Sequence, residues 1–227
     1  FGNARYIAVS DRKTVAIFSL EMPGVRVIER MIAREARINL WNIRMANLRE
    51  NEYKRYNEGV AKLSESKIFI DETSGINIMQ IRSNARKLKM EHGLDLLVID
   101  YLQLMQGRAN IENRAQEIAE ISRSLKILAR ELNIPIVALS QLNRAVENRM
   151  DKIPQLSDLR ESGSIEQDAD IVIFLGRDVV ADEEIDPSNV KVDVFIAKHR
   201  NGPTGRFQLS FVSPQTKFLD IEQAASS

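Results

Sequence analysis

Short apolar runs alternate with longer amphipathic stretches along most of the chain, which is the pattern of a mainly parallel sheet with crossover helices. Most of the runs are continuous rather than alternating, as expected of strands that helices cover on both faces. The strands predicted in this way are Val15–Leu20, Lys67–Ile70, Leu94–Ile99, Ile134–Ser140 and Ile171–Leu175. The pattern therefore predicts an α/β fold around a buried sheet.

Two of the intervening helices have clear end signals. Asn77 and Gln80 form a capping-box pattern at the start of a helix that Gly93 ends. A longer helix is predicted from about Glu112 to Leu132, and Pro135 follows its end. The apolar residues of both helices recur at helical spacing, for which core packing is the plain explanation.

The pattern changes after Gly176. Val190–Ala197 and Arg206–Val212 alternate apolar and polar residues, and a polar segment rich in Gly and Pro, Lys198–Gly205, separates them. With a last short strand at Phe218–Ile221, this predicts an antiparallel extension of the sheet with an exposed hairpin tip. We expect residues 1–227 to form one domain.

Composition narrows the class of protein. Lys and Arg together number 32, as do Asp and Glu, so the net charge is zero and any nucleic-acid contact must be local. The absence of cysteine excludes disulfides and thiolate metal sites, and His92 and His199 are too far apart in sequence to suggest a metal pair. No apolar run approaches the roughly 20 residues of a membrane span, and no signal peptide opens the chain. We expect a cytoplasmic protein with no membrane partner.

Polar residues end three of the apolar runs, where ligands of open α/β sheets bind. These residues are Glu21, Asp100 and Gln141. Singly, each has a plain explanation as a helix cap or a loop polar group. Together they indicate nucleotide hydrolysis coupled to movement. The Asp would orient Mg²⁺ beside the phosphates, the Glu would polarise the attacking water, and the Gln would sense loss of the γ-phosphate.

Five segments also resemble successive motifs of DnaB-type replicative DNA helicases, in the order of that family and over nearly the whole chain. They are Phe18–Met22, Val98–Met105, Ala138–Arg144, Leu159–Asp170 and Ala197–Pro203. The run Arg160–Asp170 is the most specific, because the fold does not demand it. The resemblance implies a RecA-like P-loop NTPase domain that assembles into a homohexamer, hydrolyses ATP with Mg²⁺ and moves along single-stranded DNA. Primase and a helicase loader are the further partners it implies.

The resemblance also assigns roles at the predicted nucleotide site. Glu21 matches the catalytic glutamate, Asp100 the Walker B aspartate that holds Mg²⁺ through water, and Gln141 the phosphate sensor. Lys198 and Arg200 match the basic pair that reaches the γ-phosphate of the neighbouring subunit. A guanidinium supplied in trans stabilises transition-state charge and makes hydrolysis depend on assembly. The plain alternative for this pair is a solvated basic turn.

A second set of matching positions is the DNA-contacting loop of the family, at Arg160, Glu161 and Gly163. Gly163 lets the backbone approach a phosphate closely, and Arg160 can pair with one. Glu161 would have to act through its backbone N–H or by orienting an arginine. Six such loops around a channel would concentrate positive potential at the pore of a neutral protein.

One element of the family is missing from these 227 residues: the phosphate-binding loop that ends in Gly-Lys-Thr or Gly-Lys-Ser. Phe1–Val9 resembles the helix that follows this loop, so we expect the loop just upstream of residue 1. Without its N–H cradle and lysine, these residues alone should neither bind nor hydrolyse ATP appreciably. The N-terminal domain and linker helix of the family are missing as well.

Two alternatives stay open from the sequence. Another RecA-like ATPase, such as a recombinase or a clock-type ring protein, predicts the same three strand-end residues but not the run Arg160–Asp170. Strand displacement on a forked duplex separates it from a helicase. The other alternative is a catalytically silent module that binds single-stranded DNA or contacts a ring, and a Gly-Lys-Thr/Ser sequence immediately upstream would exclude it.

Overall fold

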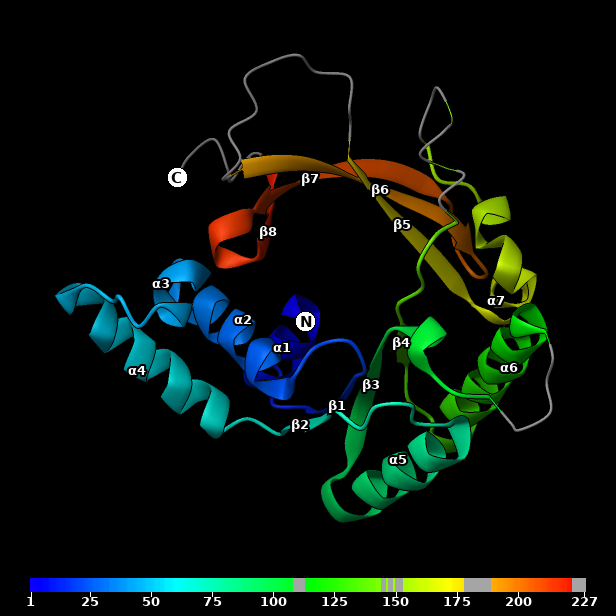
Figure 1. The fold of residues 1–227 in the computed structure, drawn as a ribbon, viewed down its shortest axis with the longest axis horizontal. Helices are drawn as coiled ribbons and strands as arrows, with labels where there is room; N and C mark the ends of the chain where they lie inside the picture. Colours follow the sequence, from blue (N-terminus) through cyan, green and yellow to red (C-terminus); the bar gives the residue numbers. More distant parts are fainter. Residues whose placement is uncertain (108–112, 144–145, 147–148, 150–152, 178–188, 222–227) are drawn as a thin grey trace.

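The computed structural model describes residues 1–107, 113–143, 146, 149, 153–177 and 189–221, without the side chains of residues 160–163, 177 and 189. These residues form two four-stranded sheets (Figure 1). The first sheet is parallel, in the order β2-β1-β3-β4, and the second is antiparallel, in the order β5-β6-β7-β8. The predicted α/β class, with a parallel sheet followed by antiparallel strands, is confirmed.

The parallel sheet brings the ends of its strands to one edge. Its strands are β1 (Thr14–Ser19), β2 (Ile68–Asp71), β3 (Leu94–Asp100) and β4 (Ile136–Ala138). Ser19 lies beside Asp100, and Ile99 lies beside Ala138. The carboxyl ends of β1, β3 and β4 therefore terminate next to one another.

Side chains of alternate residues point to opposite faces of this sheet, as in any strand. Val15 and Ile17 of β1 pack with α1 (Gly2–Val9) and α2 (Gly24–Ala36). Ala16 and Phe18 pack with α5 (Ile78–His92) and α6 (Arg114–Leu132) on the other face. All six residues of β1 are buried, which confirms that helices cover both faces of this strand.

The remaining helices of this part follow their sequence signals. The other helical elements are α3 (Leu40–Arg44), α4 (Glu50–Ser64), α5 (Ile78–His92), the short η1 (Leu102–Leu104) and α6 (Arg114–Leu132). At the start of α5, the side chains of Asn77 and Gln80 each accept the backbone N–H of the other residue at 3.0 Å, so the predicted capping box is confirmed. Gly93 ends α5 with a φ of 73°, which glycine adopts without strain.

Helical segments cover part of one face of the antiparallel sheet. It consists of β5 (Ile171–Arg177), β6 (Asn189–His199), β7 (Gly205–Val212) and β8 (Lys217–Asp220). Val172 and Phe174 are buried with Leu159 in a cluster beneath η3 (Leu156–Ser162) and α7 (Gly163–Asp168). On the opposite face, the side chains of Ile171, Ile173 and Leu175 are exposed, while Val194 of β6 is buried.

The prediction that the run Ile171–Leu175 is buried on both faces is therefore wrong. Ile171, Ile173 and Leu175 are 49 %, 55 % and 57 % exposed. The physical reason is the pairing of β5, which runs antiparallel to β6 and meets helical segments on one side only. β4 is also shorter than predicted, and Val137 in it is half exposed.

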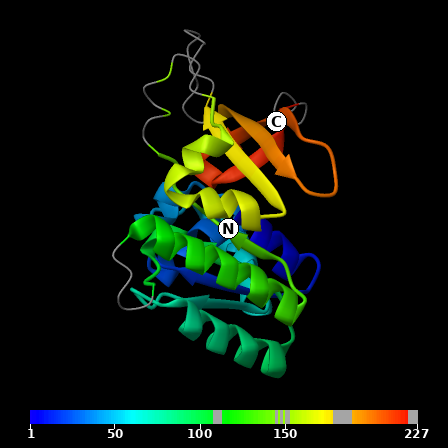
Figure 2. The ribbon, with the colours of Figure 1, turned by 90° about the vertical axis from the view of Figure 1, so that its right-hand side faces the viewer.

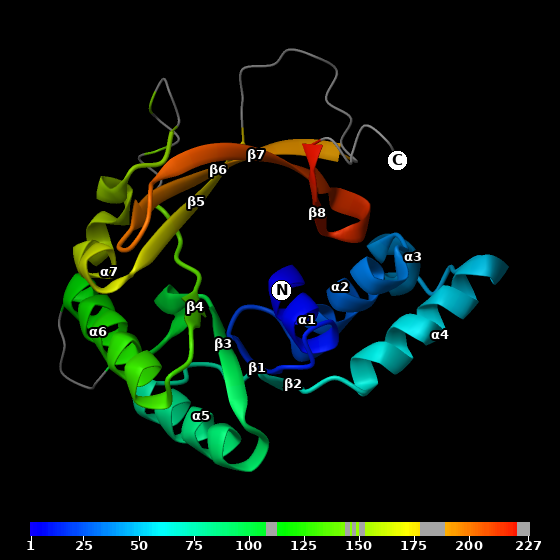
Figure 3. The same ribbon diagram turned by 180° about the vertical axis from the view of Figure 1, so that it is seen from behind.

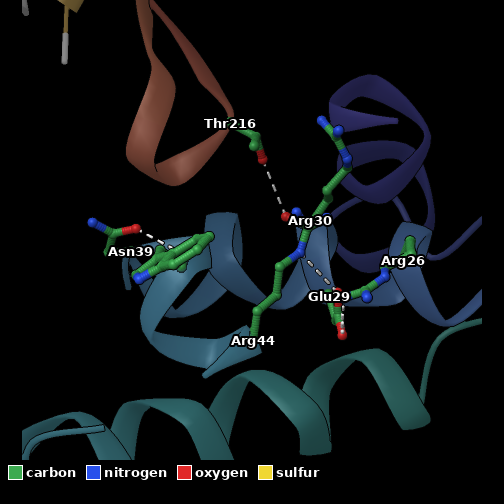
Figure 4. Close-up of polar contacts among 7 residues, drawn as sticks. Arg26, Glu29, Arg30, Asn39, Arg44 and Thr216 are labelled. Carbon is green, nitrogen blue, oxygen red and sulfur yellow. Dashed lines mark hydrogen bonds and ion pairs between the residues drawn. The ribbon is translucent and has the colours of Figure 1, made fainter. Parts of the chain in front are cut away.

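The antiparallel sheet arches over α1, α2 and α3 and meets the rest of the protein at two places (Figures 1 and 3). At one, α7 packs against α6. At the other, η4 (Ser213–Gln215) contacts α2 and α3, and the Thr216 hydroxyl donates to the Arg30 carbonyl at 3.3 Å (Figure 4). Figure 2 shows the two sheets as separate layers.

In the part of the chain that the structure describes, no helix is long and apolar enough to cross a membrane.

Candidate active site

Glu21, Asp100 and Gln141 lie just beyond, or at, the carboxyl ends of β1, β3 and β4, three neighbouring strands of the parallel sheet. We call these three residues the strand-end trio. The edge is held together by main-chain bonds: Leu20 N–H donates to the Asp100 carbonyl at 2.8 Å, and Leu139 N–H donates to the Ile99 carbonyl at 2.9 Å. The structure thus brings the three sequence-predicted residues to one edge, where ligands of open α/β sheets bind.

Asp100 is a buried carboxylate with unbalanced negative charge around it. The residue is 8 % exposed, and the pKa of its carboxyl is raised above the ordinary value. Burial is the largest cause and the charge of Glu21 is the next, while the Arg30 guanidinium acts in the opposite direction. Two carboxylates that interact in this way can share a cation.

This donor set fits Mg²⁺ when that ion arrives with a nucleotide. Mg²⁺ commonly keeps several waters and binds one or two carboxylates together with substrate phosphates, rather than a closed protein cage. The described residues contain no group of three or more His, Cys, Asp or Glu side chains that could hold a metal ion by themselves. Asp100, with Glu21 nearby, supplies the carboxylates that such an open site requires.

Glu21 does not serve as a cap for the helix that follows it. The N-cap of α2 is Pro23, with no side-chain cap bond, and the first helical N–H, that of Gly24, donates to the Glu72 carboxylate instead. The Glu21 side chain is exposed at the strand-end edge. The plain explanation of this glutamate as a helix cap is therefore not what the structure shows, and its carboxylate is accessible to a bound molecule.

Gln141 is held in place by a second glutamine, Gln103, in η1. The Gln103 amide nitrogen donates to the Ser140 hydroxyl at 2.9 Å and to the Gln141 carbonyl at 3.3 Å, while its amide oxygen accepts the Gln141 N–H at 3.2 Å. Gln103 follows Asp100 by three residues, so it joins the segments after β3 and β4. The sequence analysis gave it no role of its own, and its signal was its place in the matching segment Val98–Met105, three residues after the aspartate.

Arg30 is a second residue near the site that the sequence patterns did not single out. Its charge opposes the rise in the pKa of Asp100, which places the guanidinium near that carboxylate. In Figure 4 its side chain leaves α2 toward α1, away from the ion pairs that Glu29 forms with Arg26 and Arg44. The available signal was a basic residue between apolar positions that α2 buries.

The predicted basic pair lies on the antiparallel sheet, where other groups of the same chain bind it. The Lys198 ammonium donates to the carbonyls of Glu166 at 2.6 Å and Gln167 at 3.4 Å, at the end of α7. The Arg200 guanidinium donates to the Asp170 carboxylate at 3.2 Å, and the Arg200 N–H donates to the Asp170 carbonyl at 2.8 Å. Among the described residues, neither cation forms a hydrogen bond or ion pair with the strand-end trio.

The predicted DNA-contacting positions fall at the junction of two helical segments. The backbone of Arg160 and Glu161 belongs to η3, and Gly163 is the first residue of α7. Their side chains lie outside the described part of the structure. Their role in DNA binding therefore stays a prediction.

The segment just before these positions is anchored by Asp158. This residue is 5 % exposed, its carboxylate forms an ion pair with Arg149 and accepts the Gln155 N–H at 2.7 Å, and its carbonyl accepts the Asn143 N–H at 3.1 Å. Asn143 follows Gln141 by two residues. A short path of main-chain bonds thus joins the segment after β4 to the predicted DNA-contacting loop.

Comparison with known proteins agrees with this arrangement. Residues 2–220 match the family model of the DnaB-like helicase C-terminal domain. The replicative DNA helicase DnaC of Bacillus subtilis is 49 % identical over 221 residues, which are 97 % of this chain and 48 % of that protein. The replicative DNA helicase DnaB of Geobacillus stearothermophilus is 48 % identical over 221 residues, again 97 % of this chain and 48 % of that protein.

A solved structure, of a DnaB-like replicative helicase and its interactions with primase, superimposes with a TM-score of 0.88 at 39 % sequence identity. The match covers 95 % of this chain and 52 % of that chain. The chain spans about half the length of the curated relatives it matches. Because the family model covers nearly all of it and the identities are this high, the chain belongs to the DnaB-like helicase C-terminal domain family.

Proposed function

We propose that this chain is the ATP-hydrolysing motor domain of a replicative DNA helicase, which assembles into a homohexamer and unwinds duplex DNA by moving along single-stranded DNA. The observation that carries the proposal is the strand-end trio, because two carboxylates and an amide meet at the edge of a parallel sheet. The family membership supports the same function. A recombinase or clock-type ATPase would share the trio, but the family match favours the helicase.

At the nucleotide site, Asp100 would hold Mg²⁺ through water, and Glu21 would take part in binding it or in positioning water beside it. The ion would supply positive charge to the ATP phosphates when bound. Glu21, exposed at the edge, accepts the proton of the attacking water or orients that water. The phosphate loop must come from elsewhere in the complete protein, since none of the 227 residues forms a Gly-Lys-Thr/Ser sequence.

Gln141 would report the loss of the γ-phosphate. An uncharged amide can bind the phosphate and then change its contacts when the phosphate leaves. Gln103 fixes the backbone of Gln141, so a shift of this segment would be passed on through the bond from Asn143 to Asp158. The predicted DNA-contacting residues follow two residues later, at Arg160.

Lys198 and Arg200 would act on the ATP of a neighbouring subunit. Their position on the exposed hairpin, apart from the trio of their own chain, supports a role in trans. A guanidinium brought in by a neighbour can stabilise the charge of the transferred phosphoryl group by a large factor. Hydrolysis would then require an assembled ring.

The remaining partners are proposed from the family. One structural relative, a DnaB-like replicative helicase, is known to interact with primase. We extend this interaction, and recognition by a helicase loader, to the complete protein that contains this chain.

The proposal is tested in the complete protein by Glu21→Gln, which removes the proton acceptor and keeps the size of the side chain. We expect ATP turnover to fall by roughly 10²- to 10⁴-fold, the range for loss of a general base, while nucleotide binding measured with a fluorescent analogue persists. The matched control is Glu72→Gln, which changes the carboxylate that accepts the Gly24 N–H at the start of α2 and should leave most of the ATP turnover. Undiminished turnover in Glu21→Gln would refute the assignment. Unwinding of a forked duplex by the unaltered protein distinguishes a helicase from a recombinase.

A further inference from the structure

Asp170 lies between α7 and β5 and is bound by two cations from different elements. One carboxylate oxygen accepts from the Lys126 ammonium of α6, and the other accepts from the Arg200 guanidinium at 3.2 Å. Lys126, Arg200 and Arg130 all lower the pKa of this carboxyl, with the hydrogen bond from Lys126 as the largest cause and with burial opposing it. The carboxylate is therefore charged and fixed between two donors.

Strand pairing places Asp170 directly opposite Arg200. Ile171 pairs with His199 in the β5–β6 ladder, and the Arg200 N–H donates to the Asp170 carbonyl at 2.8 Å. Arg200 is thus attached to Asp170 by its main chain and by its side chain at the base of the hairpin turn. A guanidinium has five N–H donors, so one bond to Asp170 orients the group and leaves other donors for a phosphate.

From this geometry we propose that Asp170 is the positioning residue for Arg200, which it holds in the orientation that serves the nucleotide of the neighbouring subunit. Lys126 fixes the carboxylate from the side of α6. The inference rests on the proposed role of Arg200 in trans and adds a residue to it. Asp170 itself would touch neither ATP nor DNA.

A merely structural role is the competing explanation, in which Asp170 ties α6 to β5 through Lys126. The exposure of the carboxylate argues against it: the Asp170 side chain is 52 % exposed, while that of Lys126 is 20 % exposed and that of Arg200 is 50 % exposed. Because water screens a carboxylate this exposed, its ion pairs contribute little to folding stability. Orientation of a functional cation is a stronger reason for the arrangement.

The test is Asp170→Asn in the complete protein. We expect kcat for ATP to fall roughly 10- to 100-fold, because a small displacement of a transition-state group has effects of this size, with little change in KM and in thermal unfolding. Asp170→Glu should restore part of kcat. Asp168→Asn is the matched control: this carboxylate also bonds α6, through the Ser122 hydroxyl at 2.8 Å, but contacts no arginine in the described structure. It should leave kcat within about twofold of the unaltered protein.

Mixed hexamers decide whether Asp170 acts through the neighbour. Subunits with Asp170→Asn and subunits with Glu21→Gln are co-expressed, so that an intact catalytic site of the first can meet an intact Arg200 of the second. We expect turnover to rise above that of either parent. The pair Asp170→Asn with Arg200→Ala should show no such recovery.

Each other outcome has a defined meaning. If Arg200→Ala recovers with Glu21→Gln but Asp170→Asn does not, Asp170 does not position Arg200 and the inference is overturned alone. If neither recovers, the trans role of Arg200 fails, and the inference fails with it. If Asp168→Asn lowers kcat as much as Asp170→Asn, the arrangement is a structural tie, which also overturns the inference.

Discussion

The two sheets of this protein differ in how their strands are covered, and the difference separates two kinds of functional group. β1 in the parallel sheet is buried along its whole length between two layers of helices, while β5 in the antiparallel sheet has one exposed face. The buried sheet fixes the strand-end trio at one edge. The more open sheet presents Arg200 on a hairpin, apart from the trio of the same chain. On the proposed function, one chain would carry two half-sites: the strand-end trio, and Arg200 for the nucleotide of a neighbouring subunit.

The largest expected effect tests the half-site on the antiparallel sheet. Arg200→Ala in the complete protein should lower ATP turnover by roughly 10³- to 10⁵-fold, the range measured for arginines supplied to a neighbouring phosphate. If Arg200 acts on the site of a neighbouring subunit, co-expression of Arg200→Ala subunits with Glu21→Gln subunits should restore part of the ATP turnover. Normal ATP turnover by a ring of Arg200→Ala subunits would contradict the assignment of Arg200 to the site of the neighbouring subunit.

The next prediction concerns Asp100 in the parallel sheet and has two parts, ATP turnover and stability. Asp100→Asn should lower turnover by roughly 10²- to 10⁴-fold, because the neutral amide holds Mg²⁺ poorly. The same substitution should make the folded protein more stable at pH 7, because it removes a buried charge whose ionisation is unfavourable.

The sign of this stability effect follows from the direction of the pKa shift. Because the pKa of Asp100 is raised in the folded protein, stability that is present below the ordinary aspartate pKa is lost as the pH rises through the raised value. The advantage of Asp100→Asn should therefore shrink in acid, at about pH 4 and below. Urea unfolding of Asp100→Asn and of the unaltered protein, at pH 7 and at about pH 4, measures this difference in stability. A stability advantage of Asp100→Asn that grows in acid would contradict the raised pKa of Asp100.

A smaller effect is expected at Asp158, in the segment that connects the two sheets along the chain. Asp158→Ala leaves Arg149 without its carboxylate and the Gln155 N–H without its acceptor, so we expect a loss of about 1–3 kcal/mol in the free energy of unfolding. Urea unfolding measures this loss. Affinity for single-stranded DNA should fall as well, because the loop that begins at Arg160 loses its anchor. Asp168→Asn is again the control. An equal loss of unfolding free energy and of DNA affinity in that variant would show that Asp158 has no specific role in anchoring the loop.

The smallest effect is a stability change without a functional one. Asn77→Ala removes the capping box of α5 and should cost about 1 kcal/mol in the free energy of unfolding, with ATP turnover unchanged in the complete protein. Thermal unfolding together with a turnover assay checks both parts. A marked loss of turnover would mean that α5, which contributes no residue to either proposed half-site, takes part in the reaction.

Much of the fold could be predicted because it depends on local signals. The continuous apolar runs predicted the strands of the parallel sheet, and the residues Asn77, Gln80 and Gly93 predicted both ends of α5. The trio followed from the rule that strand ends meet, once the strands were known. The exposure of one face of β5 could not be predicted, because a continuous apolar run is compatible with a strand buried on one face or on both faces.

The sequence by itself determined the family, the order of the elements and the identity of the strand-end trio, because these depend on periodicity and on motifs that neighbouring residues form. Only the tertiary structure decided that Arg30 lies near Asp100, that Gln103 holds Gln141 and that Asp170 holds Arg200. The physical reason is that each is a contact between residues distant in sequence, or between side chains from different segments. Such contacts exist only after the sheets and helices have packed.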